Sequence, residues 1–74
     1  MKNRVDLHGL RLEELDKVLD TIVINALSQG ITSVELITGV GPLQKEIMKM
    51  CSELYNYHVY IPMSNKGIVI LDME

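Results

Sequence analysis

Two short glycine-containing segments carry the residues of this 74-residue chain that could do chemistry. Residues 6–10 read Asp-Leu-His-Gly-Leu, and residues 38–42 read Thr-Gly-Val-Gly-Pro. Histidine is the side chain that titrates near neutrality, so His8 could move a proton, and Asp6 could orient its imidazole. In a structural alternative, which the residue types alone favour, His8 bonds locally and Asp6 caps a backbone amide.

The second segment has the features of an anion site. Gly39 and Gly41 carry no side chain that would block a ligand from the backbone, and Pro42 suits the first position of a helix. The start of that helix would offer unpaired N–H groups and the positive end of its dipole to a phosphate, and Lys45 would add a charge. Because a G-x-G triplet is short, the same glycines fit at least as well a turn that serves only backbone geometry.

The elements that must position these segments follow from the apolar pattern. Four runs of alternating or continuous apolar residues predict strands, and they cover residues 4–7, 33–38, 57–61 and 68–71. A helix is predicted over about residues 11–28 and a second one from Pro42 onward, each with an apolar stripe. The stripe residues are Leu12, Leu15, Val18, Leu19, Ile22, Val23, Ala26 and Leu27 in the first helix, and Leu43, Ile47, Met50, Cys51 and Leu54 in the second.

The order of these elements, β-α-β-α-β-β, predicts an α/β fold. Two helices are too few to cover both faces of a four-stranded sheet, so we expect a two-layer sandwich with both helices on one face of a mixed sheet. Turn residues 62–67 predict that the last strand runs antiparallel to the third. Segments 6–10 and 38–42 would then leave the same edge of the sheet, where ligands bind in open α/β sheets.

Composition limits the function further. The chain has room for a single domain, residues 1–74, and its core must be aliphatic because it has no Trp, no Phe and three Tyr. Seven Lys and Arg against ten Asp and Glu give a net charge of −3, which excludes a strongly basic nucleic-acid clamp. The lone Cys51 cannot form an internal disulfide, no apolar run could span a membrane, and no signal segment is visible, so we expect a cytoplasmic protein.

Taken together and in order, the segments Val5-Asp6-Leu7-His8-Gly9-Leu10, Leu36-Ile37-Thr38-Gly39-Val40-Gly41 and Asn65-Lys66-Gly67 resemble the Smr, or small MutS-related, domain. Members of this family occur alone or at the C-terminus of MutS2-type proteins. Their hallmarks are an L-D-x-H/R-G segment and an H/T-G-x-G loop. The resemblance covers essentially the whole chain, and the pair of motifs is much more specific than either alone.

The resemblance implies a fold like the C-terminal domain of translation initiation factor three, nucleic-acid binding and, in many members, endonuclease or nicking activity on DNA or RNA. By motif position, Asp6 and His8 match the first hallmark, and Thr38, Gly39 and Gly41 match the second, so the resemblance implies catalysis by the first pair and phosphate binding by the loop. In the hydrolysis hypothesis, the loop binds phosphate with Val40 included, and Lys45 and Lys66 add weak backbone contacts. Val40 stands where the family often has a basic or aromatic residue, so we expect weak and mostly non-specific binding.

Other readings stay open. The domain could bind nucleic acid without cleaving it, or its open sheet face could form a homodimer or attach to a larger host protein. No residues have the spacing of a metal site, and the sequence leaves open whether a divalent metal ion takes part.

Overall fold

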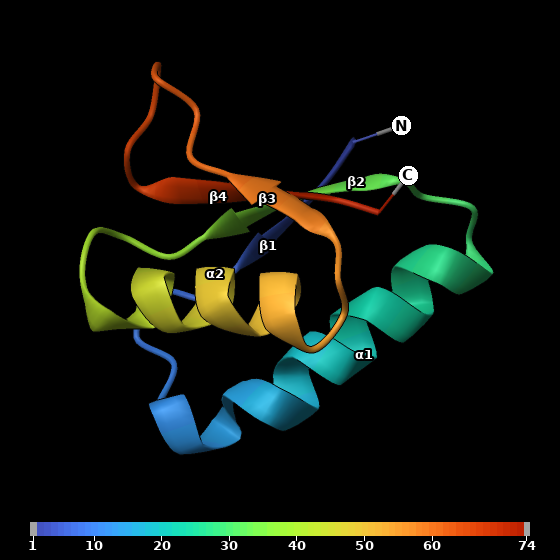
Figure 1. The fold of residues 1–74 in the computed structure, drawn as a ribbon, viewed down its shortest axis with the longest axis horizontal. Coiled ribbons are helices and arrows are strands. Elements are labelled where there is room, and N and C mark those ends of the chain that lie inside the picture. Colours follow the sequence, from blue (N-terminus) through green and yellow to red (C-terminus); the bar gives the residue numbers. More distant parts are fainter. Residues whose placement is uncertain (1, 74) are drawn as a thin grey trace.

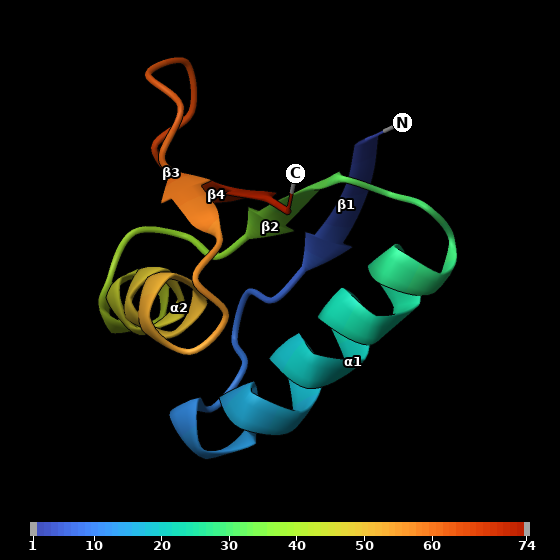
Figure 2. The ribbon, with the colours of Figure 1, turned by 45° about the vertical axis from the view of Figure 1, so that its right-hand side comes forward.

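Two helices cover one face of a four-stranded sheet in this protein. The computed structural model describes residues 2–73. The strands are β1 (Lys2–Asp6), β2 (Ser33–Ile37), β3 (His58–Tyr60) and β4 (Ile68–Asp72), and the helices are α1 (Leu15–Ser28) and α2 (Pro42–Glu53). Both helices lie on the same side of the sheet (Figures 1 and 2), so the predicted two-layer α/β sandwich is confirmed.

The strand order, β1-β2-β4-β3, places the two turns of interest next to each other. β1 pairs with β2 in parallel, with Asp6 opposite Ile37, whereas β4 pairs with both β2 and β3 in antiparallel fashion. The predicted parallel pair and the predicted hairpin are therefore both present. Because β1 and β2 are parallel neighbours, the chain leaves both strands at the same edge of the sheet.

The core is aliphatic, as the composition predicts. Val34 and Leu36 of β2 are fully buried together with Val69 and Leu71 of β4. The helices contribute further fully buried side chains, namely Leu15, Leu19, Ile47 and Cys51. Burial raises the pKa of the Cys51 thiol from 9.0 to about 11, so this cysteine stays protonated near neutral pH and acts as a small apolar core residue.

The first helix begins differently from the prediction. A single 3₁₀ turn, η1 (Leu12–Glu14), precedes α1, and the Arg11 side chain makes no capping hydrogen bond to it. Arginine has no side-chain acceptor for the free N–H groups, so the first turn tightens instead of starting as a regular α-helix. Leu12 is 53% exposed, and its predicted burial is wrong.

Other predicted boundaries also shift. β1 starts at Lys2 instead of residue 4, because its backbone pairs with β2 from Ser33 onward. Leu27 and Leu54, at the C-terminal ends of the two apolar stripes, are 54% and 69% exposed, so their predicted burial is wrong as well. Both lie in the last turn of their helix or just beyond it. The third strand shortens to His58–Tyr60.

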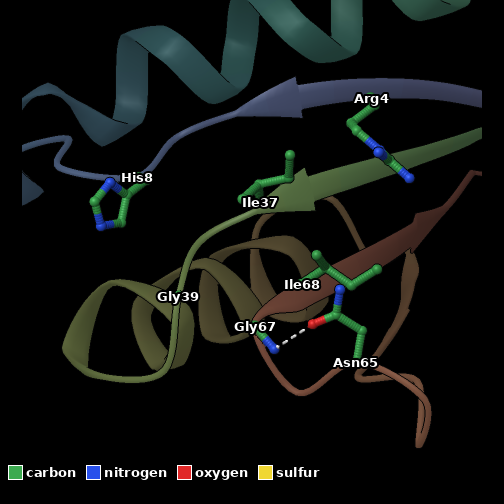
Figure 3. A pocket seen from close by; sticks show the side chains of 7 residues that line it. All are labelled: Arg4, His8, Ile37, Gly39, Asn65, Gly67 and Ile68. Atoms are coloured by element: carbon green, nitrogen blue, oxygen red, sulfur yellow. Dashed lines mark hydrogen bonds between the residues drawn. The ribbon is translucent and has the colours of Figure 1, made fainter.

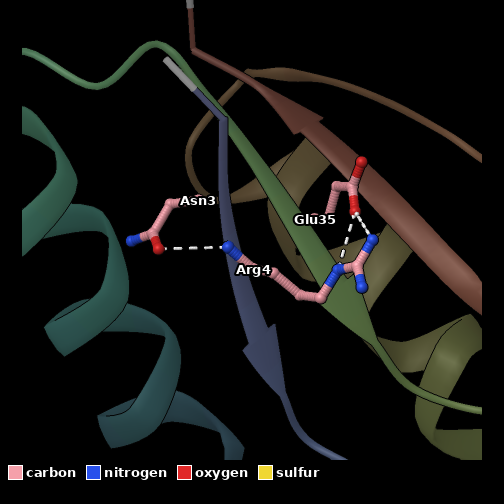
Figure 4. A network of polar contacts seen from close by, with 3 residues as sticks. All are labelled: Asn3, Arg4 and Glu35. Atoms are coloured by element: carbon pink, nitrogen blue, oxygen red, sulfur yellow. Dashed lines mark hydrogen bonds and ion pairs between the residues drawn. The ribbon is translucent and has the colours of Figure 1, made fainter.

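The face of the sheet opposite the helices is not covered by any other element of residues 2–73. Here the Arg4 guanidinium of β1 binds the Glu35 carboxylate of β2, with Nη2 at 3.0 Å and Nε at 3.1 Å from the same oxygen (Figure 4). On the far edge, the rings of His58 and Tyr60 lie 5.5 Å apart. Neither helix of the described chain is long and apolar enough to cross a membrane.

Candidate functional site

The turns that follow β1 and β2 meet in space. A Cβ atom added to Gly39 would lie 3.7 Å from Cδ2 of the His8 ring, which is ordinary van der Waals contact. Figure 3 shows His8 beside the segment that carries Gly39, at the edge where β1 and β2 end. Residues 31 positions apart in the sequence thus form one surface, as expected for the loops at the carboxyl ends of adjacent parallel strands.

Asp6 shapes the first turn. Its Oδ1 accepts the backbone N–H of His8 at 2.9 Å, and the N–H of Leu10 donates to the carbonyl oxygen of Leu7 at 3.0 Å. Gly9 completes the turn at φ +84°, a conformation that favours glycine. Leu7 is buried and fixes the turn to the core, so the exposed His8 side chain projects from a rigid base.

The second turn is held by the third segment of the resemblance, Asn65-Lys66-Gly67, through hydrogen bonds that the sequence did not reveal. The backbone N–H groups of Thr38 and Gly39 both donate to the carbonyl oxygen of Gly67, at 3.0 and 2.9 Å. The Thr38 hydroxyl is nearly buried and donates to the carbonyl oxygen of Gly39 at 2.7 Å. Thr38 therefore points inward and holds the loop, and two of the amides considered for phosphate binding are already paired.

The remaining backbone donors of this loop have no partner within the protein. Among the described residues, the N–H groups of Val40 and Gly41 have no protein acceptor. Gly41 is the N-cap of α2 with φ 154° and ψ −160°, a backbone region that is almost exclusive to glycine, and no side chain caps the helix. The N–H groups in the first turn of α2 also lack acceptors within the helix. These donors therefore lie next to Val40, whose side chain is 78% exposed.

Gln44 was missed by the sequence analysis. This residue lies in the first turn of α2 and is nearly buried, and its Nε2 donates to the carbonyl oxygen of Lys66 at 2.8 Å. The contact ties the start of α2 to the turn that also supplies Gly67. Helical spacing places residue 44 on the same face as Ile47 and Cys51, but a polar side chain at this position gave no indication of its partner in the chain.

The two lysines that the sequence analysis considered for the anion site, Lys45 and Lys66, both lie on the surface. Lys45 lies in the second turn of α2 and Lys66 in the β3–β4 turn, and both are exposed. Within residues 2–73, neither takes part in an ion pair. Their ammonium groups are therefore available to a ligand, whereas the Lys66 backbone is held by Gln44.

A pocket of about 300 Å³ adjoins the His8–Gly39 contact on the open face of the sheet (Figure 3). We call it the sheet-face pocket, and its lining residues are Arg4, His8, Ile37, Gly39, Asn65, Gly67 and Ile68. His8 also borders a second hollow, on the other side of the first turn, together with Asp6 and Glu14. In residues 2–73, no three His, Cys, Asp or Glu side chains gather as a metal-binding cluster would require.

Comparison with known proteins decides the family. Residues 5–61, a stretch that contains both turns, match the Smr domain. The chain belongs to the Smr domain family. Its structure is similar to the crystal structure of the Smr domain of Thermus thermophilus MutS2, with a TM-score of 0.85 at 20% identity over 97% of this chain and 98% of that chain. At this identity the likeness shows the fold alone. A comparison with curated proteins finds no match.

Both motif segments of this Smr domain thus lie at one edge of the sheet. His8 and Gly39 are in close proximity, and Gly41 opens toward the solvent at the start of α2. By contrast, the Asp6 carboxylate and the Thr38 hydroxyl each make a hydrogen bond within their own turn. His8 is therefore the exposed side chain of the two motifs, whereas Asp6 and Thr38 hold the turns that carry it and the glycine loop.

Proposed function

We propose that this Smr domain binds a phosphodiester of DNA or RNA at the edge formed by residues 6–10 and 38–42, and cleaves it. The observation that carries the proposal is the proximity of the exposed His8 imidazole to a loop in which the N–H groups of Val40 and Gly41 have no protein acceptor. Such N–H groups at a helix start are well suited to phosphate oxygens. Histidine is well suited to proton transfer near neutral pH.

The reaction needs few groups. The N–H groups of Val40 and Gly41 would donate to the non-bridging phosphate oxygens and stabilise the charge that develops on them. His8 would accept the proton of the attacking water or hydroxyl group, or give a proton to the oxygen that leaves. Lys45 and Lys66 would bind neighbouring phosphates. Asp6 would be a positioning residue, because its carboxylate holds the His8 backbone.

Cleavage assays with two Asp6 variants test this proposal. Wild type, Asp6→Asn and Asp6→Ala are incubated with supercoiled DNA and with labelled RNA, with and without Mg²⁺. We expect cleavage by wild type and by Asp6→Asn, since asparagine keeps an oxygen that can accept the His8 N–H, and about tenfold slower cleavage by Asp6→Ala. An equal loss of cleavage activity in both variants would show that the negative charge of Asp6 matters, and not its hydrogen bond within the turn.

Wild type that cleaves none of these substrates above the buffer control would refute the enzymatic part. Binding without cleavage would then support the non-catalytic nucleic-acid module. With or without cleavage, the net charge of −3 predicts weak binding, because a domain with few cations gains little affinity from the phosphate backbone.

Gly39 offers a test of the loop with an internal control. Gly39 and Gly30 both have φ +72°. An added Cβ would meet nothing within 4 Å at Gly30 and would meet only the His8 ring, at an ordinary contact distance of 3.7 Å, at Gly39. Alanine at either position should cost about 1–2 kcal/mol of stability, since both would be forced into the left-handed region. Only Gly39→Ala should also weaken nucleic-acid binding, by about tenfold, because Gly30 lies at the far end of α1. Fluorescence anisotropy on both variants, at a temperature where both are folded, measures the difference, and equal affinities would contradict a role for this loop.

A further inference from the structure

The sheet-face pocket has an apolar floor and a polar rim. Ile37 of β2 and Ile68 of β4 are directly opposite each other in the antiparallel register and form the floor. Arg4, His8 and Asn65 surround it, and none of the lining residues is acidic. At about 300 Å³ the pocket is at the lower limit for small-molecule sites, so it fits one compact group rather than an extended ligand.

The rim presents hydrogen-bond donors. Asn65 Oδ1 accepts the Gly67 N–H at 3.0 Å, so the orientation of the amide is fixed and its NH₂ group is left to donate (Figure 3). Arg4 uses Nε and Nη2 for Glu35, which leaves Nη1 for a ligand and holds the guanidinium over the sheet (Figure 4). The pocket therefore suits a flat group with apolar faces and acceptor atoms along its edge. A nucleobase has this chemistry, with ring carbonyl oxygens and ring nitrogens as acceptors.

The pocket adjoins the proposed phosphate site through His8 and Gly39, the residue before Val40. His8 and Gly39 line the pocket and also form the corner at which the phosphate would lie. A nucleotide whose phosphate meets the N–H groups of Val40 and Gly41 would thus have its base beside the pocket.

We propose that the sheet-face pocket binds one unpaired nucleobase of the strand whose phosphate lies at residues 39–41. A base inside a duplex has both faces stacked and its edge paired, so it can enter such a pocket only from a single strand or after leaving the helix. The substrate is therefore single-stranded, or locally unpaired, at the phosphate that binds the loop. This inference rests on the proposed function and specifies its substrate.

Binding of three labelled probes tests the inference. The probes are a single-stranded oligonucleotide, a strand of the same length made of abasic nucleotides, and the matching duplex, all measured by fluorescence anisotropy. We expect the single strand to bind about tenfold more tightly than the abasic strand, because the abasic strand loses the hydrogen bonds and apolar contacts of one base. The duplex should bind no more tightly than the abasic strand.

Asn65→Asp gives the matched variant. Aspartate keeps the oxygen that accepts the Gly67 N–H, so the turn is preserved, but it removes the NH₂ donor and adds a negative charge to the rim. The preference for the base-bearing strand should disappear in Asn65→Asp. Asn25→Asp makes the same change of charge on an exposed position of α1 and should leave the preference unchanged.

The possible results separate the two proposals. Equal binding of base-bearing and abasic strands by wild type, tighter binding of the duplex, or an unchanged preference in Asn65→Asp would overturn the base pocket and leave the phosphate site standing. Absence of binding to all three probes would overturn the proposed function and this inference together. Methyl NMR signals of Ile37 and Ile68 give a second measurement: uridine monophosphate should shift them, and ribose 5-phosphate should not.

Discussion

Leu36→Ala should unfold a large fraction of this protein under conditions where wild type is fully folded. Leu36 is completely buried, in a strand that pairs with β1 on one side and β4 on the other. Removal of such a leucine typically costs about 2–5 kcal/mol, since it leaves a cavity that the surroundings fill only partly. A 74-residue domain has about 4–11 kcal/mol of stability in total, so the loss is a large part of it.

Urea denaturation followed by circular dichroism measures this effect. Leu54→Ala is the matched control, because Leu54 is 69% exposed and its truncation should change the free energy of unfolding by less than about 0.5 kcal/mol. The midpoint of Leu36→Ala should therefore fall far below those of wild type and Leu54→Ala. Similar midpoints for the two variants would show that the aliphatic core tolerates the cavity.

The fold could be predicted because its determinants are local. The two apolar stripes repeat at helical spacing, and the segment around Leu36 is apolar enough for a central strand, so the number, type and order of the elements follow from the sequence. The single helical layer follows from the count of helices. Each of these inferences uses residues that are close together in the chain.

The strand order and the ends of the helices could not be predicted in the same way. β4 lies between β2 and β3, and nothing local specifies which strand takes the central position. Three successive residues of β4 are buried, and the reason is clear only when β2 and β3 are known to lie on either side of it. Leu12, Leu27 and Leu54 continue the stripes in sequence, but burial of a helical position depends on where the element opposite it ends, which spacing alone does not contain.

Part of the candidate site could be predicted from the sequence, and part could not. The meeting of residues 6–10 and 38–42 was predictable, because it follows from two parallel strands being neighbours. The pairing of two loop amides with Gly67 was not, because a hydrogen bond across 28 or 29 residues leaves no trace in the local sequence. The hydrogen bonds of Asn65 and Gln44 could not be predicted either. Each uses a side-chain amide to hold the β3–β4 turn around Gly67.

His8→Ala should reduce the cleavage rate by about 10²- to 10⁴-fold, the usual contribution of a positioned general acid or base. Its side chain is exposed, and the turn hydrogen bond to Asp6 uses its backbone, so the fold should survive the change. Binding of uncleaved nucleic acid should fall much less than the rate, because the loop N–H groups and the lysines remain. His58→Ala is the matched control, since His58 is also exposed but lies at the opposite edge of the sheet.

Chemical rescue distinguishes proton transfer from a structural effect of His8. Added imidazole should restore part of the activity of His8→Ala, because the vacated space lies between two open hollows that a small molecule can enter. It should have no effect on wild type or on His58→Ala. A structural role for the ring against Gly39 would instead give a variant with weaker binding, lower stability and no response to imidazole. If His8→Ala cleaves as fast as His58→Ala, the proton must be moved by another group, and the contact between His8 and Gly39 serves only to hold the two turns together.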